Sequence, residues 1–289
     1  MSRVATPTRL PSTHALRAAN VAAVLEYAWQ AEAFTASDLI GSTGLSRSTA
    51  LAVCDELIAQ GWLRGLDDTR QAGTDYRHGR PARRYALRED AGIVIGVDAG
   101  AHSIAAIAAD LRGHELARTS RPLVASKASA QARIAAIDDL IDEVLAAAGS
   151  ASTAPLCVAV GVPAPVDAEG HSPRDRDPFW RRMNPDLAES LRRRGCAIII
   201  DNDANLAALA EGAIGAGRDV SSFITVMSGE RLGAGYVLDG RLVRGRGSAG
   251  ELHLLNLVEG VGGPRGFAAV LRDWAREWAD SGALPEDTA

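Results

Sequence analysis

The sequence predicts an α/β protein whose N-terminal part is a helix-turn-helix. In the first 61 residues, apolar side chains recur at helical spacing around short turns built from small residues. An Arg-rich segment with the pattern of a β-hairpin follows directly. From about residue 89 onward, short apolar runs alternate with amphipathic helical segments, which is typical of the α/β class. The chain of 289 residues is long enough for one large domain or two moderate ones.

The composition is that of an ordinary globular protein, with 47% hydrophobic and 23% charged residues. The net charge of −5 excludes a generally basic nucleic-acid binder, so any such role needs a local patch. Cys54, Cys157 and Cys196 lack the spacing of metal ligands or a disulfide framework, and we expect free thiols. The N-terminal segment lacks the apolar core of a signal peptide, and no apolar run reaches the ~18 residues that span a bilayer. We therefore expect a cytoplasmic protein without membrane contact.

Three helices are expected before residue 61. The first covers residues 16–34, and the second lies in "TASDLIGSTG", where Thr35 or Ser37 can cap the N-terminus. The third follows a cap at Ser46, and Gly61 is placed to end it. The apolar faces of the first and third helices consist of Val21, Val24, Leu25 and Ala28, and of Ala50, Val53, Leu57 and Ile58.

The start of the third helix carries the side chains expected at a DNA interface. Ser46, Arg47, Ser48 and Thr49 combine short hydroxyls with a guanidinium, which suits contacts to phosphates and base edges in a major groove. A capped helix in an ordinary helical bundle would give the same pattern, so the assignment depends on the segment immediately after this helix.

That segment has the pattern of a β-hairpin wing. Residues 64–88 hold seven Arg and three Asp, a local excess of four positive charges. Within it, "HGRPARR" offers Arg80 and Arg83, and such a step can place an Arg in a minor groove. A solvated charged loop is the alternative. Because the segment directly follows the third helix, we favour a winged helix-turn-helix over residues 1–88.

Residues 89–289 are expected to form a second domain. "IVIGVDAGAHSIAAIAADLRGHEL" predicts two strands joined by a Gly-containing turn, a pattern typical of hairpins that cradle phosphate but also of any buried hairpin. An amphipathic helix, further strands and the strand–loop–helix segment "CAIIIDNDANLAALAEG" follow.

The ordered motifs resemble the ROK family (repressor, open reading frame, kinase) over about residues 16–270. They are "GLSRSTALAVCDELIAQGWL", "GRPARRYAL", "IGVDAG", "GVPAPVD", "DNDANLAALAEG", "GAGYVLDGRLVRG" and "GSAGEL". The resemblance implies a winged helix-turn-helix before an actin-like, sugar-kinase-like (ribonuclease H-like) domain. It also implies a regulator that binds a sugar or sugar phosphate and changes its grip on operator DNA.

The resemblance also implies roles for three residues in the second domain. Asp203 matches the base that deprotonates a sugar hydroxyl in the family's kinases, while Asn202 and Glu251 match residues that hold sugar hydroxyls. The chemistry is reasonable, because a carboxylate can accept a hydroxyl proton and amide groups suit polyols.

The two loops expected to hold ATP phosphates differ from the family pattern. The first is "DAGAHS", in which Ala101 and His102 replace a Gly and a hydroxyl residue. The second is "GERLG", in which Glu230 replaces a small hydroxyl residue and would repel a triphosphate. We therefore expect no kinase activity and no cofactor. An ATP-dependent sugar kinase with an appended DNA-binding domain is the alternative.

The family's zinc site is not expected here. Leu254 stands at the family's His position, and Gly260, Gly262 and Phe267 stand at its Cys positions. His253 lies one residue early, and a lone His is more often structural than a ligand. We expect no metal.

The chain ends earlier than the family pattern, which predicts an incomplete second lobe. The last expected helix, residues 267–278, would expose Trp274 and Trp278 unless a partner covers them. We therefore expect a homodimer. Taken together, the sequence predicts a sugar-responsive transcriptional regulator that represses carbohydrate genes and whose partners are operator DNA and a sugar or sugar phosphate. A DNA-binding protein whose second domain no longer senses a sugar remains a further alternative.

Overall fold

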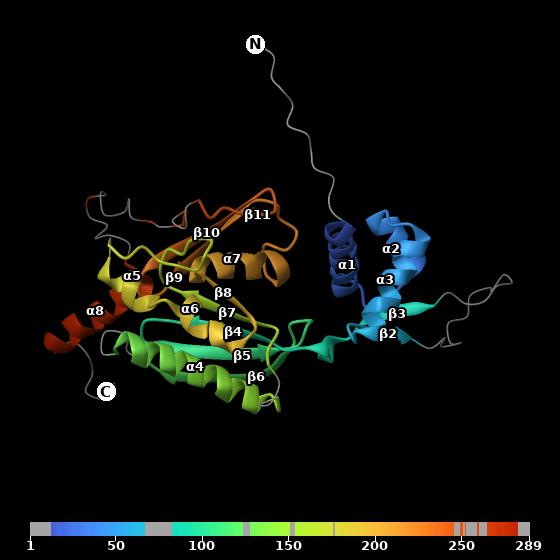
Figure 1. The fold of residues 1–289 in the computed structure, drawn as a ribbon. Coiled ribbons are helices and arrows are strands. Elements are labelled where there is room, and N and C mark those ends of the chain that lie inside the picture. The colour runs from blue at the N-terminus through green and yellow to red at the C-terminus, as the bar shows by residue number, and fades with distance from the viewer. Residues whose placement is uncertain are drawn as a thin grey trace, which may run out of the picture. The chain divides into compact units, whose positions relative to one another are not determined.

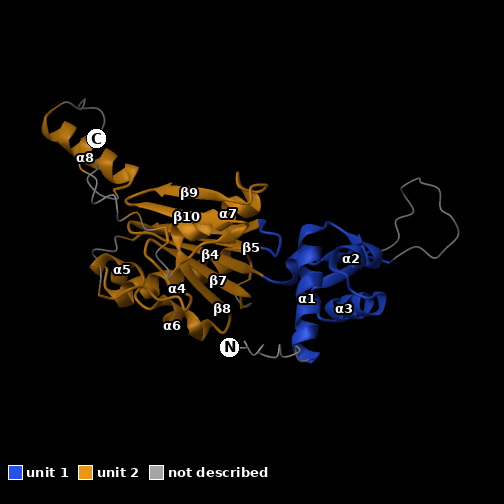
Figure 2. Ribbon diagram, turned by 90° about the horizontal axis from the view of Figure 1, so that it is seen from above, with its two compact units in different colours: residues 1–92, 110–114 blue, residues 93–109, 115–289 orange. Residues whose placement is uncertain are grey.

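A computed structural model gives the fold in Figure 1. It describes residues 13–66, 83–123, 128–150, 154–175, 177–245, 249–250, 252, 259 and 265–282. The chain divides into two compact units (Figure 2). The first consists of Met1–Gly92 with Asp110–His114, and the second of Ile93–Ala109 with Glu115–Ala289. The sequence predicts a domain boundary after residue 88, and the chain first passes from one unit to the other after Gly92. The sequence analysis does not predict that Asp110–His114 returns to the first unit.

The first unit combines three helices with a small antiparallel sheet. Its elements are α1 (Thr13–Gln30), β1 (Phe34–Thr35), α2 (Ala36–Thr43), α3 (Arg47–Ala59), β2 (Leu63–Leu66), β3 (Arg84–Leu87) and the 3₁₀ helix η1 (Glu89–Ala91). The strand order is β1-β3-β2, and β2 pairs with β3 from Leu63↔Leu87 to Leu66↔Arg84. The first helix ends four residues earlier than expected, because Phe34 enters the sheet opposite Tyr85.

Local sequence explains where α2 and α3 begin and end. Thr35 caps α2 through a reciprocal capping box with Asp38, and Ser46 caps α3 by accepting a hydrogen bond from Thr49 N at 3.2 Å. Between the helices, Gly44 adopts φ 70°, the left-handed conformation that ends α2 and that other residues adopt at a cost.

The core of the first unit lies where α1, α2 and α3 meet the sheet. Phe34 is buried between Tyr27, at a ring-centroid distance of 5.4 Å, and Tyr85, at 5.7 Å. The predicted apolar positions Val24, Ala28, Ala50, Val53 and Leu57 are all buried here. This burial of apolar surface is what stabilises the unit.

The return segment Asp110–His114 completes the first unit by covering the end of α1. The Arg112 guanidinium donates to the carbonyls of Trp29 (2.6 Å) and Ala31 (2.8 Å), and the Trp29 indole donates to Leu111 O (2.7 Å). Leu111 packs against the apolar core of the unit. Since the last carbonyls of a helix have no intrahelical donors, Arg112 acts as a C-terminal cap for α1.

The second unit contains two sheets. The five-stranded mixed sheet has the order β6-β5-β4-β7-β8, in which β4, β7 and β8 are parallel, and the three-stranded antiparallel sheet has the order β11-β10-β9. The strands of the large sheet are β4 (Val94–Ala99), β5 (Ser103–Ala109), β6 (Glu115–Pro122), β7 (Cys157–Val162) and β8 (Ala197–Asn202). Those of the small sheet are β9 (Phe223–Ser228), β10 (Leu232–Leu238) and β11 (Arg241–Leu242).

The helices of the second unit pack on different faces of its sheets. They are α4 (Ala130–Ala147), α5 (Pro178–Met183), α6 (Leu187–Leu191), α7 (Asp203–Ile214) and α8 (Phe267–Asp280), with the 3₁₀ helix η2 (Arg192–Arg194). α4 packs on β5 and β6, whereas α7 lies between the two sheets and contacts β9 and β10 as well as β7 (Figure 1). The apolar face of α4, with Ile137, Leu140, Ile141 and Val144, is fully buried against the large sheet.

The helix α8 has an apolar face without a partner among the described residues. Its side chains Phe267, Leu271, Trp274 and Trp278 are between 45% and 61% exposed, as the sequence predicts for the two tryptophans. They recur at helical spacing and so form one stripe. Among the helices that the structure describes, none is both long and apolar enough to cross a membrane.

Candidate functional site

A cavity of about 190 Å³ opens in the second unit at the ends of strands β4, β7 and β8. Because the carboxyl ends of parallel strands share one edge of a sheet, the loops that follow them converge there. The β9–β10 turn closes the opposite side. The lining residues are Asp98, Gly100, Ala101, Pro163, Phe179, Trp180, Asn202, Asp203, Met227, Gly229, Glu230, Arg231, Leu232 and Gly233.

The three polar residues of "DND" make different contacts. Asp201 is buried, accepts a hydrogen bond from Asn205 Nδ2 at 2.9 Å and forms an ion pair with Arg244 at 2.8 Å. Asn202 lines the cavity, but its Oδ1 caps α7 through Ala204 N (3.0 Å) and its Nδ2 donates to Ala164 O (3.1 Å). Asn202 therefore shapes the site through the backbone, and its contact with a sugar stays a prediction.

Asp203 is the first residue of α7 and lines the cavity. Its Oδ1 accepts a hydrogen bond from Ala204 N at 2.8 Å. Asp203 thus lines the cavity, and its contact with a sugar hydroxyl stays a prediction.

Asp98 and the buried Arg133 organise the first loop. Asp98 is accessible from the cavity, yet the surrounding protein desolvates it and raises its pKa, an effect that the charge of Arg133 partly offsets. Burial lowers the pKa of Arg133 to about 10, so the guanidinium remains charged near neutral pH. It donates to the carbonyls of Ala99, Gly100 and Met183, which ties this loop to the end of α5.

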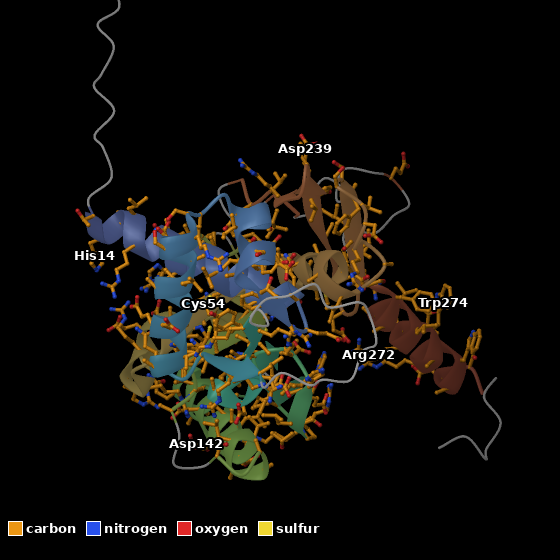
Figure 3. The ribbon with its side chains drawn as sticks, turned by 90° about the vertical axis from the view of Figure 1, so that its right-hand side faces the viewer. His14, Cys54, Asp142, Asp239, Arg272 and Trp274 are labelled. Carbon is orange, nitrogen blue, oxygen red and sulfur yellow. The ribbon has the colours of Figure 1, made fainter. Side chains whose placement is uncertain are left out.

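Charged side chains also occupy the second loop, at the β9–β10 turn. Glu230 lies 3.5 Å from His102 Nε2 and forms an ion pair with Arg272. Arg272 belongs to α8, where Figure 3 labels it. Arg231 donates to Asp177 at 3.1 Å and stacks on the Phe179 ring at 5.1 Å. Burial alone would raise the pKa of Asp177, but hydrogen bonds from Phe179 N and Arg231 outweigh it, so the pKa is lowered.

The candidate DNA-contacting residues lie on the first unit. Arg47 is exposed on the first turn of α3, and no ion pair to it occurs within the described residues. The Ser46 hydroxyl caps the helix and also contacts Ser48 Oγ (3.0 Å) and Thr49 Oγ1 (2.9 Å). Arg83 pairs with Asp55 of α3 at 2.7 Å. The structure therefore brings Arg83 and α3 together, while their contacts with DNA stay predictions.

Two predicted site residues, Arg80 and Glu251, lie outside the described residues. Conversely, sequence reasoning missed the roles of Arg133, Arg231 and Arg272. Each has its acidic or carbonyl partner at least 33 positions away in the chain, so no local pattern could have indicated it.

One group of side chains in the described part of the chain has metal-ligand spacing. The ligand atoms of Glu89, Asp110 and His114 lie within 4.8 Å of one another. Asp110 already accepts hydrogen bonds from Arg112 N (2.8 Å) and His114 N (2.9 Å), and its other oxygen contacts His114 Nδ1 (2.9 Å). These contacts explain the group as the closure of a tight turn, so it gives no reason to expect a metal there.

Comparison with known proteins identifies the family. Residues 94–262, more than half of the chain, match the ROK family. The chain belongs to the ROK family. This membership covers the whole cavity region and agrees with the α/β architecture of the second unit.

Several curated ROK relatives are similar over part of their length. A putative xylose repressor from Caldicellulosiruptor sp. (strain Rt8B.4) is 28% identical over 214 residues, which cover 72% of this chain and 51% of the repressor. A glucokinase from Streptomyces coelicolor is 29% identical over 174 residues, which cover 58% of this chain and 50% of the kinase. The chain thus spans about half the length of these relatives.

A solved ROK structure shares the fold of nearly the whole chain. It is a ROK family transcriptional regulator, a homolog of the E. coli MLC protein, with a TM-score of 0.67 and 20% identity. The match covers 93% of this chain and 69% of the other. A polyphosphate/ATP-glucomannokinase from Arthrobacter sp., 26% identical with a TM-score of 0.50, matches 63% of this chain and 72% of its own. The fold is therefore found in a regulator and in a sugar kinase.

Proposed function

We propose that this ROK protein is a cytoplasmic, DNA-binding transcriptional regulator that represses carbohydrate genes and releases its operator when a sugar binds. The observation that carries the proposal is the exposed, Ser-capped first turn of α3 beside the β2–β3 hairpin, in the same chain as the ROK cavity. The similarity to a putative xylose repressor over 72% of the chain supports it.

The first unit suits a winged helix-turn-helix. α2 and α3 would form the helix-turn-helix, with α3 entering the major groove and the β2–β3 hairpin serving as the wing. Arg47 would then contact a phosphate or base edge from the helix start. Arg83 would hold the wing against α3 through Asp55, which fixes the distance between the two DNA-contacting elements.

The cavity would bind the sugar without phosphorylating it. Phosphoryl transfer consists mostly of positioning phosphates and neutralising their charge. At this cavity Glu230 adds a negative charge, and Arg231 is held by Asp177. Asp203 would therefore act as a hydrogen-bond acceptor for a sugar hydroxyl rather than as a catalytic base.

A sugar kinase with an appended DNA-binding domain is the second candidate, favoured by the similarity to a glucokinase. Incubation of the full chain with ATP, Mg²⁺ and a panel of hexoses and pentoses distinguishes the two. We expect no sugar-dependent ADP release. Turnover with any sugar that is lost in Asp203→Asn would establish the kinase instead.

The regulator itself is tested by finding its DNA. Genome-wide occupancy identifies the operator, and fluorescence anisotropy on that DNA then measures affinity with and without each sugar. We expect tight binding of the free protein and release by at least one sugar. Specific binding that no sugar changes would favour a regulator whose second unit no longer senses a ligand, and absence of specific sites would overturn the proposal.

A further inference from the structure

We infer that the cavity selects an unphosphorylated monosaccharide and rejects its phosphate ester. This inference rests on the proposed function and narrows it, because a sugar and a sugar phosphate are both open as effectors. It depends on the charges that line the cavity and on where the nearby hydrogen-bond donors already point.

Acidic groups dominate the lining of the cavity. Asp98, Asp203 and Glu230 contribute three carboxylates, and Arg231 is the one cation among the lining residues that the structure describes. Carboxylates accept hydrogen bonds and cannot donate them when ionised, so they suit the hydroxyl groups of a sugar. A phosphate dianion would face the same carboxylates with a charge of the same sign.

Three arginines beside the cavity, in the part of the chain that the structure describes, already contact protein partners. Arg231 donates to Asp177 at 3.1 Å and lies on the Phe179 ring, and Arg272 pairs with Glu230. Arg133 directs its guanidinium to backbone carbonyls, including that of Gly100 at 2.9 Å. A phosphate would have to break one of these contacts before it gained any of these three arginines.

Backbone donors at two helix starts beside the cavity are used as well. Helix N-termini bind anions because their first N–H groups lack intrahelical partners. At α7, Asn202 and Asp203 accept from Ala204 N (3.0 and 2.8 Å), and at α5 Asp177 accepts from Phe179 N (2.8 Å). The protein thus supplies its own oxygen atoms at these two helix starts.

Backbone groups of the β9–β10 turn also form hydrogen bonds, both within the turn and to the residues that begin α8. Gly229 N donates to Arg231 O (3.3 Å), and Gly229 O in turn accepts from Ala268 N (3.1 Å). Phe267 N donates to Ser228 Oγ at 2.9 Å. The N–H groups of Gly229, Phe267 and Ala268 are thus used within the protein, and the turn contributes Glu230 to the cavity lining.

The size and the apolar part of the cavity fit a single sugar ring. Its volume of about 190 Å³ lies below the roughly 300 Å³ at which pockets for drug-sized ligands begin. Pro163, Trp180 and Leu232 supply apolar surface beside the carboxylates. A pyranose or furanose ring combines apolar C–H faces with hydroxyl donors, which matches both parts of this lining.

The test measures binding of matched pairs to the full chain by isothermal titration calorimetry. The pairs are glucose and glucose 6-phosphate, mannose and mannose 6-phosphate, N-acetylglucosamine and its 6-phosphate, and ribose and ribose 5-phosphate. We expect at least one free sugar to bind and its phosphate ester to bind at least about tenfold more weakly. Inorganic phosphate should bind no more strongly than the esters.

Two outcomes would overturn the inference, and they differ in what they mean for the proposed function. Tighter binding of a phosphate ester than of its free sugar would refute the charge selection and leave the sugar-responsive regulator intact. Binding of no member of any pair, while the protein still binds operator DNA, would refute the sugar effector itself.

The variant Glu230→Gln tests the cause of the selectivity. It removes one negative charge with little change of shape, so the ratio of free-sugar to ester affinity should fall at least about threefold. Glu169→Gln makes the same charge change at an exposed side chain outside the cavity lining and should leave the ratio unchanged. An unchanged ratio in a folded Glu230→Gln protein would overturn the assignment to this carboxylate, and the wild-type ratio decides the inference if that variant does not fold.

Discussion

At the scale of single residues, the two carboxylates of "DND", which Asn202 separates, have different surroundings. Asp201 is 4% exposed and is held by Asn205 and Arg244, whereas Asp203 opens on the cavity at the start of α7. The difference follows from the end of β8: Asp201 still belongs to the strand, whereas Asp203 is the first residue of α7. The first Asp is therefore a structural residue, and the second lines the cavity.

This difference predicts opposite phenotypes for two neighbouring substitutions. Asp203→Asn should abolish sugar-induced release from DNA while leaving DNA binding of the free protein and its thermal stability nearly unchanged. Asp201→Asn should reduce the free energy of unfolding by about 2 kcal/mol, because a buried acceptor of several hydrogen bonds loses its charge. Anisotropy and denaturant unfolding measure the two effects. A normal sugar response in Asp203→Asn would mean that this carboxylate only caps α7.

The exposed guanidinium of Arg47 predicts a specific change in DNA binding. Arg47→Ala should weaken operator binding by about 1–3 kcal/mol and reduce the salt dependence by the loss of about one phosphate contact. Arg192→Ala, an exposed Arg of the second unit, is the matched control. The test is the operator affinity of both proteins at two salt concentrations. Equal affinity of Arg47→Ala and wild type at both concentrations would show that Arg47 of α3 does not contact the DNA.

At the scale of elements, local signals in the sequence predicted well where helices begin. Thr35 and Ser46 cap α2 and α3 as expected, because a cap contacts a backbone N–H only three residues away. The contacts of Arg112 with the end of α1 could not be predicted, since its partners lie 81 to 84 positions earlier. The ion pairs that hold the cavity loops could not be predicted either, because their partners also lie far apart in the chain. The sequence therefore indicated Asp203 but not the charges around it.

The Arg112 cap predicts a local loss of stability in the first unit. Arg112→Ala should reduce the free energy of opening the C-terminal turn of α1 by about 1.5–3 kcal/mol, because a charged donor to several helix-terminal carbonyls is removed. Arg112→Lys should restore only part of this, since one ammonium cannot reproduce the guanidinium geometry. Hydrogen exchange at the C-terminal turn of α1 is the measurement, and unchanged protection in Arg112→Ala would show that Trp29 and Leu111 hold this end without the cap.

At the scale of the whole molecule, the apolar stripe of α8, which no described residue covers, leads us to predict self-association. Phe267, Leu271, Trp274 and Trp278 expose a continuous apolar face, and a contiguous face of this kind marks an interaction site. A repressor that reads one half-site with each winged helix also requires two copies on a palindromic operator. Pairing of two α8 helices about a two-fold axis would satisfy both conditions.

We therefore predict a homodimer in which α8 contributes to the interface. Trp274→Glu places a charge in the stripe and should shift the protein to monomers or aggregates, because the charge would lose its hydration in the interface. Arg276→Glu introduces the same side chain on the opposite side of α8, where Arg276 is exposed, and should leave the dimer intact. Light scattering coupled to size-exclusion chromatography compares the three proteins at equal concentration. A stable wild-type monomer that Trp274→Glu does not alter would mean that the stripe is not a dimer interface, and dimeric DNA binding would then need another surface.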